Sequence, residues 1–175
     1  MWAAALLLGL LPALGLDGRI VDPFVMGDAK AVVLIFLRTD CPISNRYAPE
    51  LQRIGAKFTG RQVRFWLVYP DKNEPAEEIR RHAAEYRYPG EALRDPNREL
   101  VRAAQVSVTP EAAVFLPGKK LVYHGRIDDR VIDFGKVRPQ ASSHDLEDAL
   151  EAVLAGRSVA QPSTKAIGCY ISDLP

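Results

Sequence analysis

Cys41 is the residue of this chain best placed to act as a nucleophile. It follows an apolar run and stands at the start of a predicted helix, with Pro42 in the first turn, where a missing N–H costs nothing. Unpaired backbone N–H groups and the positive end of the helix dipole favour thiolate over thiol at such a position. Three residues later, where a C-x-x-C motif has its second cysteine, the chain has Ser44. The local sequence therefore provides half of a dithiol site.

The second thiol of the chain is Cys169, in the segment Gly168-Cys-Tyr-Ile171 near the C-terminus. A thiolate that attacks a peroxide becomes a sulfenic acid, and one that attacks a disulfide becomes a mixed disulfide. Either product needs a resolving thiol, and within this chain only Cys169 can serve. A structural disulfide with Cys41 and a free Cys169 that anchors a partner are the alternatives. Spacing alone leaves all three open.

Other kinds of functional site have no support in the sequence. It contains no phosphate-binding glycine-rich loop, no G-x-S-x-G motif and no zinc-ligand spacing. The net charge is +1, without a basic patch that would indicate nucleic-acid binding. His82 falls in a charged helix and is expected at the surface. We therefore expect no cofactor, no bound metal and no nucleic-acid partner.

The apolar patterns predict the elements that position Cys41. Residues 31–37 are rich in β-branched residues and predict a strand buried on both faces. Residues 42–58 have helical apolar spacing, and Pro49 predicts a kink there. The remaining expected elements are strand 63–69, helix 74–86, helix 95–104, strand 112–116, strand 120–125 and helix 143–154. This order predicts an α/β fold with a mixed central sheet flanked by helices on both faces.

The ends of the chain are predicted to be separate from this domain. Residues 2–11 form an apolar run that fits the hydrophobic segment of a signal peptide and is too short to span a membrane. We predict a signal peptide over residues 1–15, the domain over 16–156 and a tail over 157–175. Export would make the protein periplasmic or secreted, with no membrane span in the mature chain. Without cleavage it is expected in the cytoplasm, with a buried N-terminal helix as the alternative structure.

The order of elements, with Cys41 after the first core strand, resembles the thioredoxin-like superfamily. Two motifs carry the resemblance, Phe36-Leu-Arg-Thr-Asp-Cys-Pro42 and Val108-Thr-Pro110. Within the superfamily the chain is most similar to the redoxin branch, which comprises the alkyl-hydroperoxide-reductase/thiol-specific-antioxidant (AhpC/TSA) family and bacterial exported thioredoxin-like proteins. The resemblance implies a thioredoxin-like fold with a cis-proline at Pro110 facing Cys41. It also implies that the Thr109 backbone pairs with an extended partner.

The sequence departs from both branches that it resembles. Peroxiredoxins carry Thr or Ser three residues before the active cysteine, whereas this chain has Arg38 there and Thr39 one position later. Thioredoxins carry Trp immediately before the first cysteine and a second cysteine three residues after it, where this chain has Asp40 and Ser44. The copper-chaperone branch needs a second cysteine four residues after the first, so metal delivery is not expected.

An arginine is the remaining site residue that the resemblance implies. In peroxiredoxin sites an arginine stabilises the thiolate and polarises the peroxide. Arg126, just after the last predicted strand, is the candidate for this role, and Arg38 is its rival. Local ion pairs with Asp128 and Asp129 are the alternative explanation for Arg126.

These residues and the resemblance together predict a thiol-based redox protein. Cys41 would act as the nucleophile of a thiol–disulfide oxidoreductase or of a peroxiredoxin-like peroxidase. The predicted site contains Cys41, Thr39, Pro110, Arg126 and Cys169. The expected partners are a peroxide or a protein disulfide or thiol as substrate, and an external reductant, either thioredoxin-like or a membrane electron donor. The alternative is a non-catalytic partner-binding module in which Cys169 is structural or forms a crosslink.

Overall fold

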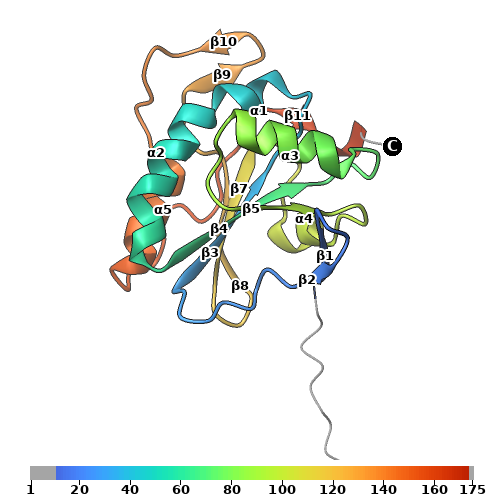
Figure 1. The fold of residues 1–175 in the computed structure, drawn as a ribbon. Helices are drawn as coiled ribbons and strands as arrows, with labels where there is room; N and C mark the ends of the chain where they lie inside the picture. Colours follow the sequence, from blue (N-terminus) through green and yellow to red (C-terminus); the bar gives the residue numbers. More distant parts are fainter. Residues whose placement is uncertain (1–10, 174–175) are drawn as a thin grey trace, which may run out of the picture.

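The computed structural model of the protein describes residues 11–173, and a mixed β-sheet forms its centre (Figure 1). The sheet has seven strands in the order β2-β1-β5-β4-β3-β7-β8. Strands β3, β4 and β5 are parallel, whereas β7, β8, β1 and β2 pair antiparallel with their neighbours. Their bounds are β1 Ala13–Gly15, β2 Ile20–Val21, β3 Ala31–Phe36, β4 Val63–Tyr69, β5 Glu91–Arg94, β7 Glu111–Leu116 and β8 Lys120–Gly125.

Helices cover both faces of this sheet, as predicted for an α/β fold. Successive side chains of a strand point to opposite faces. Val33 and Ile35 of β3 therefore belong to the core cluster that includes α2, α3 and α5, whereas Leu34 and Phe36 belong to the cluster that includes α4. The helices are α1 Pro42–Arg46, α2 Ala48–Phe58, α3 Ala76–Glu85, α4 Glu99–Ala104 and α5 Asp145–Leu154, and short 3-10 helices span Thr59–Arg61 and Ile171–Asp173.

Two helix predictions differ from the structure in their bounds. The helix expected over residues 42–58 is broken at Tyr47, and Pro49 lies in the first turn of α2, where its missing N–H needs no partner. The helix expected from residue 95 begins at Glu99. Asp95 lies ahead of it, and its carboxylate accepts hydrogen bonds from the backbone N–H groups of Glu99 and Val101 at 2.9 and 3.0 Å. Asp95 therefore caps the helix from outside.

Several short strands lie where the sequence predicted loops. A hairpin of β9 (Val131–Asp133) and β10 (Lys136–Val137) occupies the region expected as a loop. A separate pair joins β6 (Val108–Thr109) to β11 (Cys169–Tyr170). These strands contain two or three residues each, too few to show an alternating apolar pattern.

The predicted signal peptide lies largely outside the described residues. Residues 1–10 are not described, and Ala13–Gly15 forms β1, which pairs with β2 and β5. Cleavage and export therefore stay predictions. Within residues 11–173, no helix has the length and apolar character needed to cross a membrane.

Ion pairs join α2 and the 3-10 helix that follows it to α5 on the outside of the domain. Glu147 contacts Arg53 and lies 2.6 Å from Lys57 Nζ. Glu151 receives two hydrogen bonds of 2.9 Å from the Arg61 guanidinium. The pKa of the Glu147 carboxyl is lowered to about 2 by its hydrogen bond from Arg53. The pKa of the Glu151 carboxyl is likewise lowered to about 2 by its hydrogen bond from Arg61. These contacts therefore need ionised carboxylates.

The ion pairs of Glu147 and Glu151 predict that the free energy of unfolding decreases in acid. Carboxyls with a lowered pKa stabilise the fold above their ordinary value near 4.5, and that contribution is lost as the pH falls toward about 2. Because the groups are partly exposed, Glu147→Gln should lower the melting temperature at pH 7 by only about 2 °C. At about pH 2 the variant and the parent should melt together. Scanning calorimetry across this range tests it, and a gap that widens in acid would contradict it.

Candidate active site

Cys41 is the N-cap residue of α1 and is completely buried. β3 ends just before it, Pro42 begins the helix, and the Asn45 N–H donates to the Cys41 carbonyl at 3.1 Å. The predicted placement of the thiol at a helix start is confirmed. Its sulfur lies 3.2 Å from the carbonyl oxygen of Thr109.

Thr109 and Pro110 are both buried beside Cys41, and the peptide bond between them is cis. The structure therefore has the cis-proline that the resemblance implies, in the segment whose carbonyl contacts the thiol. Thr109 ends β6, so the backbone next to Cys41 is a strand edge that a second extended segment can pair with.

Cys169 fills that position. In the antiparallel pair of β11 with β6, Cys169 lies opposite Thr109, and Tyr170 lies opposite Val108. The sulfurs of Cys41 and Cys169 are 2.7 Å apart, and both thiols are free. Two residues that are remote in sequence are therefore held in contact by backbone pairing.

The tail that carries Cys169 is also attached to β8. Its Thr164 N–H donates to the carbonyl of His124 at 3.2 Å, and its hydroxyl lies 2.7 Å from the hydroxyl of Tyr123. Gly125 makes this close approach possible, because its φ is +145° and a Cβ there would lie 2.8 Å from the Thr164 nitrogen. The tail thus reaches the thiol site from a fixed point on the sheet.

The two thiols have opposite pKa shifts. Burial raises the pKa of Cys41, but the hydrogen bond with Cys169 and the polar groups of Ser44 and Thr109 nearby outweigh burial and leave the pKa below its ordinary value. Burial raises the pKa of Cys169, and so do its hydrogen bond to Cys41 and the charge there. Cys41 is therefore the thiol that ionises first, and Cys169 holds the proton.

Thr39 faces a buried glutamate. Both its backbone nitrogen and its hydroxyl lie 2.6 Å from Oε1 of Glu74, which is 7% exposed. Burial raises the pKa of Glu74, and the hydrogen bonds from Thr39 partly oppose that shift. The pair fixes the turn between β3 and Cys41. Sequence reasoning missed Glu74 because its surroundings, Asn73-Glu-Pro75, are typical of an ordinary turn.

His82 contacts α1 through Asn45, and the prediction that it lies at the surface is wrong. It is 6% exposed, with Nε2 2.7 Å from Oδ1 of Asn45 and Nδ1 2.8 Å from the hydroxyl of Tyr69. Burial lowers its pKa to about 4, so it is neutral. His82 lies three residues after buried Ile79, on the inward face of α3.

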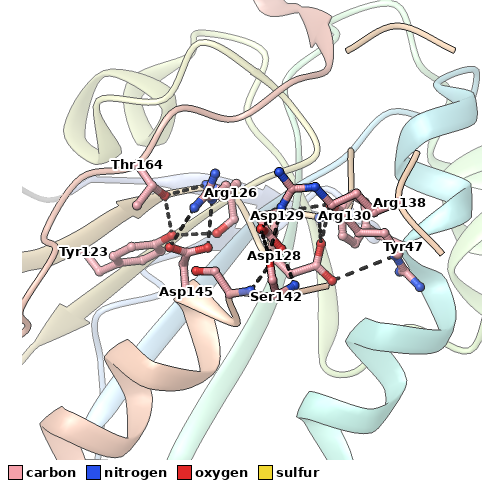
Figure 2. A network of polar contacts seen from close by, with 11 residues as sticks. Tyr47, Tyr123, Arg126, Asp128, Asp129, Arg130, Arg138, Ser142, Asp145 and Thr164 are labelled. Atoms are coloured by element: carbon pink, nitrogen blue, oxygen red, sulfur yellow. Dashed lines mark hydrogen bonds and ion pairs between the residues drawn. The ribbon is translucent and has the colours of Figure 1, made fainter. Parts of the chain in front are cut away.

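Arg126 is engaged by Asp145 and Thr164 (Figure 2). Its guanidinium donates to both carboxylate oxygens of Asp145, at 2.8 and 3.2 Å, and its backbone nitrogen donates to Thr164. Arg38, the rival candidate, forms an ion pair with Asp40 at 2.8 Å. Its positive charge opposes the rise in the pKa of Cys169, whereas the charge of Asp40 adds to that rise. Of the two arginines, the structure brings Arg38 into the electrostatic environment of the dithiol.

Arg126 forms an ion pair, as the alternative explanation expected, but its partner is Asp145 and not the neighbouring Asp128 or Asp129. Asp129 contacts Arg138 and accepts hydrogen bonds from Ser142, as Figure 2 shows. Asp128 accepts a hydrogen bond of 2.7 Å from the hydroxyl of Tyr47. Asp128 thereby ties this loop to Tyr47 at the start of α2, whereas Asp129 joins two parts of the loop to each other.

The comparisons with known proteins agree with this geometry. The model of the AhpC/TSA family matches residues 15–124. The chain belongs to the AhpC/TSA family. No curated protein matches its sequence.

Solved structures support the thioredoxin-like fold. A hypothetical protein from Sinorhizobium meliloti 1021 is 22% identical, with a TM-score of 0.76 over 91% of this chain and 88% of that one. An uncharacterized conserved protein from Geobacillus kaustophilus is 26% identical, with a TM-score of 0.74 over 93% and 89%. A secreted disulfide oxidoreductase from Mycobacterium tuberculosis is 17% identical, with a TM-score of 0.54 over 83% and 94%.

Proposed function

We propose that this AhpC/TSA protein is a thiol–disulfide oxidoreductase that cycles between a dithiol and a disulfide of Cys41 and Cys169. The observation that carries the proposal is the contact of the two sulfurs, 2.7 Å apart. Their opposite pKa shifts also support it, because attack needs one thiolate. Cys41 is the attacking thiol, and Cys169 resolves the product.

In the oxidative half of the cycle, the Cys41 thiolate attacks one sulfur of a substrate disulfide. The substrate S–S bond breaks, one substrate thiolate leaves, and a mixed disulfide forms on Cys41. Deprotonated Cys169 then attacks the sulfur of Cys41, and the second substrate thiolate leaves. The substrate gains two electrons and two protons, and the protein retains a Cys41–Cys169 disulfide. Because Cys41 is fully buried, the tail must leave the site before the substrate enters.

In the reductive half, an external thiol attacks the disulfide at Cys169. Cys169 is half-buried, whereas Cys41 is completely buried, so the sulfur of Cys169 is the accessible one. The Cys41 thiolate is also the better leaving group, because its pKa is the lower of the two. A protein dithiol, either thioredoxin-like or part of a membrane electron donor, is the proposed reductant.

The other predicted site residues act through position. Pro110 and Thr109 form the wall against which the thiols lie, and Thr39 with Glu74 fixes the turn that ends at Cys41. Arg126 holds α5 and the tail together through Asp145 and Thr164. Arg38 supplies positive charge near Cys169.

A peroxidase is the second candidate, and family membership favours it. In that reaction the Cys41 thiolate displaces an alcohol or water from the peroxide and becomes a sulfenic acid. Cys169 then attacks this sulfur and releases water, which leaves the same disulfide. Disulfide exchange ranks first because Thr39 and Arg126 are already engaged by Glu74 and Asp145. Rates with a peroxide and with a peptide disulfide, measured side by side, distinguish the two.

The predicted export is also part of this proposal. Residues 1–15 would be the leader, residues 16–156 the catalytic domain and residues 157–175 the tail with the resolving thiol. Cleavage after residue 15 would remove β1, which is an observable change to the sheet. N-terminal sequencing of the protein recovered from cell fractions tests it, and an intact N-terminus in the cytoplasm would contradict it.

The order of thiol ionisation is the direct test of the proposed function. In the reduced wild-type chain, iodoacetamide should modify Cys41 at a pH below about 8.5, whereas Cys169 should need a higher pH, with the two positions distinguished by mass mapping. One equivalent of oxidant should convert the wild-type chain to a Cys41–Cys169 disulfide, identified by mass mapping. A disulfide that resists dithiols, or a Cys41 that ionises no earlier than Cys169, would instead indicate a non-catalytic binding module.

A further inference from the structure

The segment Gly168–Ile171 shows what the edge of β6 accepts. At Gly168 an added Cβ would lie 2.7 Å from the carbonyl carbon of Thr109 and 3.3 Å from the Pro110 nitrogen, so this position excludes a side chain. Cys169 then reaches Cys41. Two residues further on, Ile171 is 3% exposed, and its N–H donates to the Ser107 carbonyl at 2.9 Å.

Tyr170, between Cys169 and Ile171, is 54% exposed. This position therefore accepts different side chains. Backbone pairing with β6 gives a strand its register, and the pockets for alternate side chains give it specificity. The edge of β6 that the segment Gly168–Ile171 occupies is called the slot. It selects residues at three positions of a bound strand: a glycine, the cysteine that follows it, and an aliphatic residue two places after the cysteine.

We propose that this slot binds a partner protein through an extended Gly-Cys-x-aliphatic segment, which takes the place of the tail during disulfide exchange. The inference rests on the proposed function and specifies its substrate class. Phe134 of the β9–β10 hairpin is 58% exposed and lines the same cavity as Ser107 and Val108. It does not belong to the tail, so it remains beside β6 when the tail leaves and gives the partner one exposed aromatic side chain to pack against.

During the exchange, the partner strand and the tail occupy the same slot one after the other. The partner strand pairs with β6, and the Cys41 thiolate attacks the partner cysteine in its disulfide, whose other sulfur leaves as a thiolate. Return of the tail brings Cys169 to the mixed disulfide, and the same movement displaces the partner strand as its thiolate. The partner strand therefore pairs with β6 during recognition, and the tail pairs with β6 when the product is released.

Peptide disulfides test this selectivity. The Cys169→Ser chain would be mixed with Gly-Cys-Tyr-Ile whose cysteine carries a 2-thiopyridyl group, so that attack by Cys41 releases thiopyridone and is followed by absorbance. We expect this peptide to react at least about tenfold faster than Ala-Cys-Tyr-Ile or Gly-Cys-Tyr-Asp, a difference of 1.4 kcal/mol. Equal rates for the three peptides would overturn the proposal.

A second variant applies the same steric rule to the tail itself. In Gly168→Ala with Cys169→Ser, the new Cβ meets the Thr109 carbonyl, so the tail should leave the slot and capture of Gly-Cys-Tyr-Ile should accelerate. Unchanged capture would contradict the shared slot. The pyridyl disulfide of mercaptoethanol is the control for Cys41 itself. If that reagent also fails to react, the proposed function fails, whereas its reaction without peptide selectivity overturns only this inference.

Discussion

Cys169→Ser is expected to stop catalytic turnover and to leave one attack per molecule by Cys41. The nucleophile and its helix start are untouched, but the mixed disulfide no longer has a thiol 2.7 Å away to resolve it. With a peptide disulfide and an excess of dithiol, we expect the steady-state rate to fall at least about a hundredfold, since resolution becomes bimolecular. The first turnover, measured as released substrate thiol, should still approach one equivalent.

Cys41→Ser is the matched control, because it should lose both the first equivalent and the turnover. The two serine variants thus separate attack from resolution at sites that contact each other. Wild-type turnover in Cys169→Ser would contradict the role of the tail, since an external thiol would then be resolving Cys41 directly.

Ile171→Asp is expected to detach the tail and to slow disulfide formation between the two cysteines by about a hundredfold. The isoleucine side chain is 3% exposed and packs in the core cluster with Phe36 and Leu100, so a carboxylate there loses apolar contacts and must be desolvated. A loss of about 3 kcal/mol in tail docking corresponds to that factor. Quenched-flow alkylation after one equivalent of oxidant measures the rate.

Tyr170→Asp is the control for added charge, because Tyr170 is exposed and pairs with β6 only through its backbone. It should form the disulfide at close to the wild-type rate. Circular dichroism and the melting temperature report whether the domain stays folded in both variants. Equal slowing in the two variants would show that charge near the site, and not loss of the Ile171 anchor, limits the reaction.

The parts of the site that the sequence predicts are those with a local signal. The apolar run of β3 and the Cys41-Pro42 motif predicted the thiol at the helix start, and the Val108-Thr-Pro110 motif predicted the segment that faces it. The element order predicted the mixed sheet with helices on both faces. Each of these features lies within a few neighbouring residues or in the regular periodicity of an element.

The features that the sequence could not establish depend on contacts between distant segments. β11 has only two residues, so the sequence has no alternating pattern that would predict it. Its pairing with β6 depends on the path of the tail past Thr164. The contact of Thr39 with Glu74 likewise spans a whole helix–strand unit. For Arg126 the sequence offered two roles, and only the position of Asp145 shows which partner its guanidinium has.

Attachment of Cys169, the proposed resolving thiol, by a tail has a consequence for the reduction potential of the proposed Cys41–Cys169 couple. In a C-x-x-C motif both thiols belong to one helix, whereas here Cys169 is held by the pairing of β11 with β6 and by the burial of Ile171. By linkage, docking of the tail favours the disulfide and the disulfide favours docking by the same free energy. Once the tail detaches readily, each further loss of about 1.4 kcal/mol in docking should raise the potential by about 30 mV. The oxidising strength of the protein can thus be adjusted from residues that never touch a sulfur.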